Sequence, residues 1–264
     1  MTHATTNGLP SGSSAKGSNP RVALVTGAGS GIGRATARKL ASQGYTVACV
    51  DLSGDSVQET AAGLVGAIGI RCDVTKEADV VACIEHAIKH YGRLDVVVNN
   101  AGITSRADVE QEPTENFDKV MAVNARGTFL VSKYAMRHLR ATRGCIVNVA
   151  SITAMVGRKG GVAYCASKSA IMGLTRAMAV DHIGEGIRVN AVCPGGVDTP
   201  LVARYVSQAK DPDELAKQVK ARYLPMGRMA TPEEIASAIA YLASDDAGFI
   251  TGTGLVIDGG ILMQ

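Results

Sequence analysis

The sequence predicts an α/β protein with a doubly wound, mostly seven-stranded parallel sheet and helices on both faces. Short runs rich in Val, Ile and Ala alternate with longer segments of helical period almost to the end of the chain, as successive βαβ units require. The runs are continuously apolar, which is typical of parallel strands buried on both faces. The first run leads directly into a glycine-rich segment that opens a helix.

The chain has 264 residues, a length at which an α/β protein can form a single domain. Residues 1–20 contain 14 residues of the Gly, Ser, Thr, Asn or Pro type and no hydrophobic period, so we expect a disordered tail ahead of one domain at 21–264. The expected strands are 22–26, 45–51, 67–73, 94–99, 145–150, 188–193 and 255–258. The expected helices are 31–43, 55–64, 76–91, 114–140, 162–182 and 232–243, the last opened by Thr231 as N-cap and Pro232 at the first helical position.

One interval departs from this alternation. Residues 200–229 follow the sixth strand, are charged, contain Pro212 and Pro225, and have weak periodicity. Because ligands of open α/β sheets bind beyond the carboxyl ends of the strands, we expect a mobile lid over a substrate pocket here.

Composition excludes several classes of protein. The net charge of +3 is spread along the chain without a Lys/Arg run, so nucleic acid is not an expected partner. No apolar run reaches the roughly 18 residues of a membrane span, and the N-terminus lacks a secretion signal. Six cysteines without a Cys-x-x-Cys pair indicate reduced packing residues in a cytoplasmic protein.

The glycine segment predicts a dinucleotide site in a Rossmann-like fold. Glycine lets main chain approach a pyrophosphate closely, and the following helix N-terminus offers N–H donors. The absence of a Gly-Lys-Ser/Thr ending argues against a nucleoside-triphosphate loop, while a merely tight strand-to-helix turn is the alternative. The residues expected at the cofactor are Gly27, Ser30, Gly31, Ile32 and Gly33.

An acidic residue at the end of the second strand predicts which dinucleotide binds. Asp51, about 20 residues beyond the loop, can accept hydrogen bonds from a ribose diol and would repel a 2′-phosphate. Leu52 follows it without an adjacent Arg or Lys. Arg34 and Arg38 on the first helix are the opposing observation. The predicted cofactor is NAD, in preference to NADP.

Tyr164 and Lys168 stand four residues apart in a helical segment, hence on one face. Lowering the Tyr pKa from about 10 by about 3 units requires roughly 4 kcal/mol, which one ammonium at about 4 Å supplies at an effective dielectric of about 20. An exposed surface pair is the alternative. Ser151, at the carboxyl end of the fifth strand, favours a catalytic site because its hydroxyl can bind a substrate oxygen.

Further motifs occur in order along the chain. They are Thr26 to Gly33, Asp73, Asn99-Asn100-Ala101-Gly102, Asn124, Ser151, Tyr164 to Lys168, Pro194-Gly195 and Thr199. With them, the chain from residue 21 to 264 resembles the compact single-domain branch of the short-chain dehydrogenase/reductase family.

The resemblance implies an NAD-dependent oxidoreductase that transfers a hydride to or from a secondary alcohol or ketone. Tyr164 would be the acid/base, Ser151 would polarise the substrate oxygen, and Lys168 would act on Tyr164 and hold the nicotinamide ribose. Asn124 would secure a water that relays protons to Lys168. The remaining implied cofactor contacts are Leu52, Asp73, Val74, Asn100, Ala101, Gly102, Pro194, Gly195, Val197 and Thr199. A homotetramer is also implied.

The substrate itself stays open between a polyol, a hydroxy acid and a 3-oxoacyl compound. The residues expected at it are Ser151, Thr153, Arg158, Tyr164, Gly196 and Arg204. The basic residues of this region predict either a clamp for an anionic group of the substrate or solvated charges at the rim of the pocket. They are Arg158, Lys159, Arg204 and Arg222.

Other functions were weighed as well. His86 and His90 beside Glu85 have metal-ligand spacing without a third ligand nearby, so no metal is expected. The alternative functions are a redox-sensing NAD-binding regulator and an epimerase or dehydratase on the same fold.

Overall fold

The computed structural model describes residues 20–207, 211–215, 217 and 224–263; the N-terminal tail expected at 1–20 lies almost wholly outside this range. Seven strands form one sheet in the order β3-β2-β1-β4-β5-β6-β7, and every neighbouring pair is parallel. The strands are β1 Val22–Thr26, β2 Thr46–Asp51, β3 Ile68–Arg71, β4 Val96–Asn99, β5 Cys145–Val149, β6 Arg188–Pro194 and β7 Gly254–Ile257. The predicted doubly wound parallel sheet is thereby confirmed.

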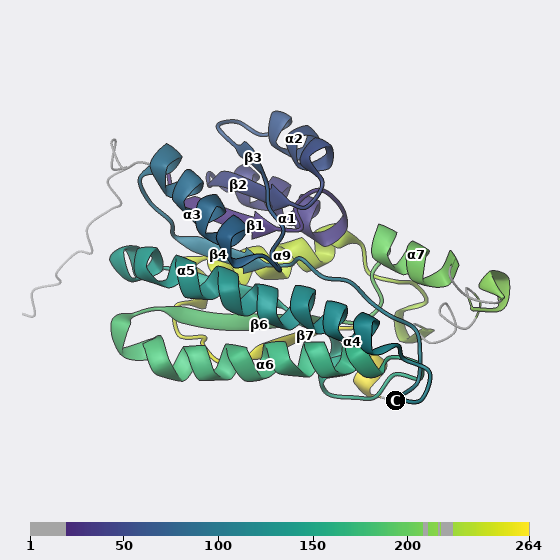
Figure 1. Ribbon diagram of the computed structural model, residues 1–264. Helices are drawn as coiled ribbons and strands as arrows, with labels where there is room; N and C mark the ends of the chain where they lie inside the picture. Colours follow the sequence, from purple (N-terminus) through teal and green to yellow (C-terminus); the bar gives the residue numbers. More distant parts are fainter. Residues whose placement is uncertain (1–19, 208–210, 216, 218–223, 264) are drawn as a thin grey trace, which may run out of the picture.

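Helices cover both faces of the sheet (Figure 1). On one face lie α1 Gly31–Ser42, α2 Gly54–Ala62 and α9 Pro232–Ala243. On the other lie α3 Glu77–Tyr91, α5 Gly127–Thr142 and α6 Val162–His182, with α4 Thr114–Met121 beside α6. Successive residues of β1 enter opposite cores, since Ala23 packs with the first group and Leu24 with the second. The strands are therefore apolar throughout because both of their faces are buried.

The interval after β6 contains a helix that the sequence reading did not name. Helix α7 Pro200–Ser207 stands out at one side of the molecule (Figure 1). Pro200 occupies its first position, where a missing N–H costs nothing, and the Thr199 hydroxyl accepts a hydrogen bond from the Val202 N–H at 3.4 Å. These local signals start a helix despite the weak periodicity of the interval.

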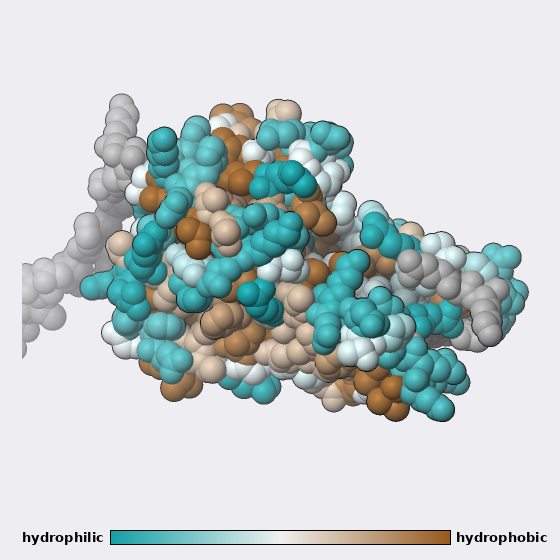
Figure 2. Space-filling view, viewed as in Figure 1, coloured by the Kyte–Doolittle hydropathy of each residue, from teal (hydrophilic) through white to brown (hydrophobic). Residues whose placement is uncertain are grey.

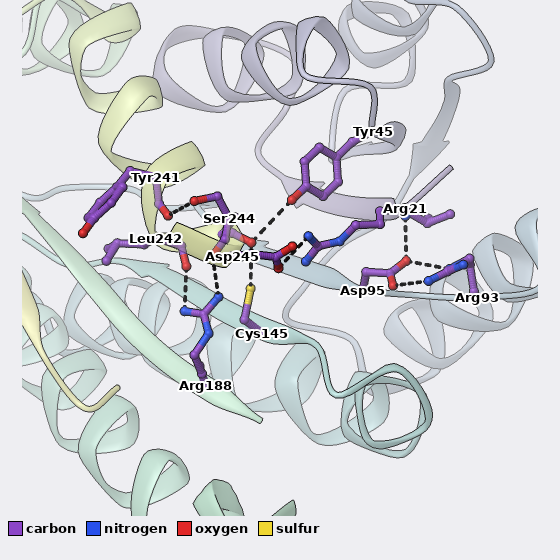
Figure 3. Close-up of polar contacts among 12 residues, drawn as sticks. Arg21, Tyr45, Arg93, Asp95, Cys145, Arg188, Tyr241, Leu242, Ser244 and Asp245 are labelled. Carbon is purple, nitrogen blue, oxygen red and sulfur yellow. Dashed lines mark hydrogen bonds and ion pairs between the residues drawn. The ribbon is translucent and has the colours of Figure 1, made fainter. Parts of the chain in front are cut away.

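The amino ends of the strands carry a polar network (Figure 3). Asp95, just before β4, is buried and accepts hydrogen bonds from the Val22 N–H and, at two atoms, from Arg93. Arg188, at the start of β6, donates to the carbonyls of Leu242 and Ser244 at the end of α9. These groups satisfy one another, so this edge of the sheet serves stability.

The candidate site lies at the opposite edge of the sheet. The face seen in Figure 2 is largely hydrophilic, with apolar residues in separate patches. No described helix has the length and apolarity to cross a membrane. All six cysteines are free thiols, five of them buried and Cys165 half-buried. His86 and His90 are exposed on α3, and the described residues contain no group of three or more metal-ligating side chains.

Candidate active site

The glycine loop between β1 and α1 is shaped by close backbone approach. Gly27 and Gly31 have φ values of +65° and +51°, which disfavour residues with a Cβ. A Cβ on Gly33 would lie 2.1 Å from the Gly27 carbonyl oxygen. Ser30 is the exposed N-cap of α1 but makes no side-chain cap, and the first turn has no acidic residue. The N–H groups of this turn are therefore left for an anion.

Asn100, directly after β4, holds this loop in place. Its Nδ2 donates to the carbonyls of Thr26 and Gly27 at 2.9 and 3.2 Å. The N–H groups of Asn100 and Ala101 both donate to the Thr26 hydroxyl. The predicted cofactor residues of β1 and β4 are thus brought together by hydrogen bonds within the protein.

Asp51 closes the other side of the loop. Its two carboxylate oxygens accept hydrogen bonds from the N–H groups of Gly29 at 2.9 Å and Ser53 at 3.0 Å. The Arg34 guanidinium donates to the Gly29 carbonyl and pairs with Glu59 at 3.2 Å. Arg38 is exposed on α1, and Leu52 is exposed beside Asp51.

Asp73 and Val74 follow β3. Although burial opposes ionisation, hydrogen bonds from Thr75 and the nearby Lys76 lower the pKa of Asp73. The side chain of Val74 is buried against Gly127 at the start of α5. Asp73 is consequently held as a carboxylate, while Val74 can offer a ligand only its main chain.

Ser151, Tyr164 and Lys168 meet beyond the carboxyl end of β5. The Ser151 hydroxyl accepts a hydrogen bond from the Thr153 N–H at 3.2 Å and donates to the Pro194 carbonyl at 3.4 Å. Lys168 Nζ donates to the Val149 carbonyl at 2.7 Å and lies 5.5 Å from the Tyr164 ring centroid. The three residues share a cavity of about 100 Å³ with Ile32, Asn100, Gly102, Pro194, Gly195, Val197 and Thr199.

Lys168 is almost inaccessible to solvent, with 4% of the residue exposed. Burial lowers the pKa of Lys168 from its ordinary 10.5 to about 8, because a low-dielectric surrounding disfavours the charged form. Close to neutral pH this side chain therefore exchanges a proton more readily than a surface lysine does.

Asn124 lies in a five-residue π-helix, Ala122–Arg126, between α4 and α5. Its fully buried amide accepts a hydrogen bond from the Ile103 N–H at 2.8 Å and donates to the Ile103 carbonyl and the Ser167 hydroxyl. The continuous helix expected at 114–140 is thus wrong in detail, because the wider turn interrupts it. Such turns occur frequently at functional sites, but the apolar spacing of the sequence did not reveal this one.

A second, larger cavity of about 880 Å³ is also lined by Ser151 and Tyr164. Of the predicted substrate residues, Ser151, Thr153, Arg158, Tyr164 and Gly196 line it, as does Lys159. Arg204 does not, because α7 turns Leu201, Val202 and Tyr205 toward the cavity and leaves Arg204 exposed. Arg222 lies outside the described residues.

The sequence reading did not name several of the lining residues, among them Arg106 and Tyr205. The signal for Tyr205 was available, since its spacing from Leu201 and Val202 places the three on one face of a helix. Arg106 carried no comparable signal, because it lies in an irregular segment after β4.

Comparison with known proteins places the chain among oxidoreductases. The family model described as enoyl-(acyl carrier protein) reductase matches residues 27–262. The 2-(R)-hydroxypropyl-CoM dehydrogenase of Xanthobacter autotrophicus is 43% identical over 90% of this chain and 97% of its own.

Two solved structures of reductases or dehydrogenases are also similar to this chain. A short-chain type dehydrogenase/reductase from Mycobacterium marinum has a TM-score of 0.86 and 34% identity, over 92% of this chain and 96% of its own. A 3-ketoacyl-(acyl-carrier-protein) reductase from Brucella melitensis complexed with NADH has a TM-score of 0.84 and 34% identity, over 91% of this chain and 98% of its own.

Proposed function

The chain belongs to the short-chain dehydrogenase/reductase family, and from this premise we propose that it transfers a hydride between NAD(H) and the carbon of a secondary alcohol or ketone. One observation carries the proposal. Ser151, Tyr164 and Gly195 line both the narrow cavity beside the glycine loop and the large cavity under α7. A cofactor in the first and a substrate in the second would meet at the same hydroxyl groups.

The residues present fit a dinucleotide. The Cβ atoms that Gly27, Gly29 and Gly33 lack would each fall within 3.0 Å of neighbouring atoms, so the loop keeps its backbone bare at the start of α1. When bound, a nicotinamide cofactor accepts or supplies the hydride. The pyrophosphate would lie against the loop, and Lys168, Gly102 and Pro194 would border the nicotinamide ribose and ring.

The protein's own residues would handle the proton. Ser151, fixed between Thr153 and Pro194, would orient the substrate oxygen toward Tyr164. The Tyr164 hydroxyl would take the proton of an alcohol or give one to a ketone. Lys168, when charged, would favour the phenolate, and Asn124 would hold a water behind Lys168 through the π-helix that fixes its position.

NAD is the proposed cofactor in preference to NADP. The Asp51 carboxylate stands at the end of β2 and would accept hydrogen bonds from a ribose diol. Arg34, the cation best placed to receive a 2′-phosphate, is engaged by Glu59 and the Gly29 carbonyl.

The alternatives fit less well. A regulator without catalysis would not need the complete trio of Ser151, Tyr164 and Lys168 around a cavity for a second molecule. Epimerisation or dehydration would use the same fold, but the similar proteins described above are dehydrogenases and reductases.

Turnover by a Tyr164→Phe variant tests the proposal. A screen of secondary alcohols, polyols and hydroxy acids with NAD, read by nicotinamide absorbance, should identify substrates for the wild type. On these the variant should lose at least 100-fold in kcat, the loss expected when a proton-transfer group is removed, while NADH binding by fluorescence persists. Near wild-type turnover by the variant would contradict the mechanism.

Two further proposals concern the surroundings of the site. Of the interval 200–229, residues 208–210, 216 and 218–223 lie outside the described residues. We propose that α7 within this interval acts as a movable lid, supported by its three side chains that face the large cavity. A cytoplasmic location is supported by the six unpaired cysteines, all within the described residues.

We also propose a homotetramer. Exposed large apolar residues occur on α5 and α6 and again around β7, and two separate interfaces are what a four-subunit assembly of dihedral symmetry needs.

A further inference from the structure

Arg158 is the charged side chain most closely associated with Tyr164 within the large cavity. Its guanidinium carbon lies 4.7 Å from the centroid of the Tyr164 ring and 4.8 Å from that of Tyr205 on α7. The side chain is half-buried, so it is not one of the solvated rim charges that the sequence reading allowed. Two aromatic contacts hold the guanidinium in one orientation at the junction of α6 and α7.

The three nitrogen atoms of this guanidinium differ in their hydrogen bonds. Nη2 donates to the Thr104 hydroxyl at 3.0 Å and to the Ser105 carbonyl at 3.2 Å. Nε is buried and unpaired, and it lies 2.7 Å from the position that a Cβ on Gly161 would take. Nη1 makes no hydrogen bond to a described residue and is not among the buried unpaired atoms, and Arg158 lines the cavity. Nη1 is therefore the group that a bound molecule can reach.

The charge of Arg158 is not neutralised within the described part of the chain. Arg158 forms no ion pair there, although acidic residues also line the cavity. A partly buried cation without a counter-ion is costly, and a ligand anion would offset that cost. Thr153, two residues after Ser151, lines the same cavity, and its hydroxyl is buried and unpaired.

We propose that Arg158 binds a carboxylate of the substrate through Nη1, so that the enzyme acts on secondary alcohols or ketones that also carry an acid group. This inference rests on the proposed function and narrows its substrate class. Since Nη2 is committed to Thr104 and Ser105, the contact is made by the single amino group Nη1, not by the two-pronged fork that Arg often offers to carboxylates.

Binding measured without turnover tests the subsite. The wild type saturated with NADH is titrated by calorimetry with cyclohexanecarboxylate and with its uncharged amide. We expect the carboxylate to bind at least tenfold more tightly, since a hydrogen bond to a charged group contributes about 1.5–3 kcal/mol. Arg158→Gln should remove this ratio and Arg158→Lys should retain part of it. Lys119→Gln, which removes an exposed cation of α4 that does not line the cavity, should change it less than threefold.

The outcomes separate the possible roles of Arg158. Equal binding of acid and amide by the wild type, or an equal loss of both in Arg158→Gln, would overturn the subsite, the latter because Arg158 would then only support the cavity wall. Tighter binding of cyclohexanesulfonate or cyclohexyl phosphate than of the carboxylate would overturn the carboxylate assignment.

Kinetics provide an independent readout. In turnover of 3-hydroxybutanoate and its methyl ester, Arg158→Gln should raise KM for the acid at least tenfold relative to the ester. A shifted pH profile with an unchanged acid-to-ester ratio would instead mean that Arg158 acts on Tyr164, and would overturn the proposal. If no alcohol is oxidised at all, the proposed function fails, whereas the calorimetric result still decides the subsite.

Discussion

At the scale of single residues, the site contains a charged group whose burial lowers the stability of the fold. Lys168 is an ammonium with almost no solvent contact, held by one carbonyl of β5. In the proposed mechanism its charge acts on Tyr164, whose ring centroid lies 5.5 Å away. The loss of folding stability caused by burying the Lys168 charge should be measurable.

Lys168→Met should therefore stabilise the protein at neutral pH. The pKa of Lys168 falls from 10.5 unfolded to about 8 folded, so between these values the unfolded chain binds more protons and stability rises with pH. Below pH 8 the buried charge costs about 3 kcal/mol. The variant should melt at a higher temperature than the wild type at pH 7, with the difference shrinking toward pH 10.

The same melting curves for Lys89→Met provide the control, because Lys89 is exposed on α3. A difference for Lys168→Met that does not change with pH would show that desolvation is not its cause.

Asp51 should decide cofactor preference. Asp51→Asn removes the charge that repels a 2′-phosphate while an amide oxygen can still accept one of the two backbone hydrogen bonds. We expect the ratio of kcat/KM for NADP over NAD to rise at least tenfold. Asp55→Asn, in the first turn of α2, is the matched control and should leave the ratio unchanged, whereas no change in Asp51→Asn would contradict the assignment.

At the scale of elements, two local irregularities define the site. The glycine loop brings the backbone of β1 against the first turn of α1, and the π-helix Ala122–Arg126 places the amide of Asn124 on Ile103 and Ser167. Both depart from regular structure where a ligand or a water would be held, and regular helices pack on either side of them.

Gly33→Ala tests the loop. The added methyl would lie 2.1 Å from the Gly27 carbonyl oxygen, so the loop must move and NADH affinity should fall at least tenfold. Gly63 ends α2 at φ −83°, and a Cβ at this position would make only an ordinary contact. The control variant Gly63→Ala should therefore bind NADH as the wild type does. Unchanged NADH binding by Gly33→Ala, measured by fluorescence titration, would argue against cofactor binding at the loop.

At the scale of the whole molecule, the two edges of the sheet have different tasks. At the amino ends, Asp95 joins the start of β1 to the residue before β4, and Arg188 joins the start of β6 to the end of α9 (Figure 3). At the carboxyl ends, the cavities retain unpaired groups such as the Thr153 hydroxyl. This division agrees with the general position of ligands in open α/β sheets.

The proposed homotetramer is also a prediction about the whole molecule. Light scattering should give a mass near 109 kDa, four times that of the 27.3 kDa chain. Val180 on α6 is 76% exposed, and Val180→Asp should shift the protein to smaller species because a charge would enter the interface. Val65→Asp, at 97% exposure between α2 and β3, should not. A monomeric wild type would contradict the proposal.

The sequence by itself determined the sheet, the helices that cover it and most candidate groups, because these depend on local patterns. Continuous apolar runs specify buried parallel strands, the glycine spacing specifies the loop, and a separation of four residues places Tyr164 and Lys168 on one helix face. The interruption at Asn124 escaped this reading because a π turn inserts a residue without breaking the apolar pattern.

Only the tertiary structure decided which charges face the substrate cavity. Arg158 and Arg204 were equal candidates in the sequence, yet Arg158 is held between Tyr164 and Tyr205 while Arg204 points away. These contacts join α6 and α7 through residues 41 positions apart in the chain. The packing of separate elements sets such contacts, and no local spacing encodes them.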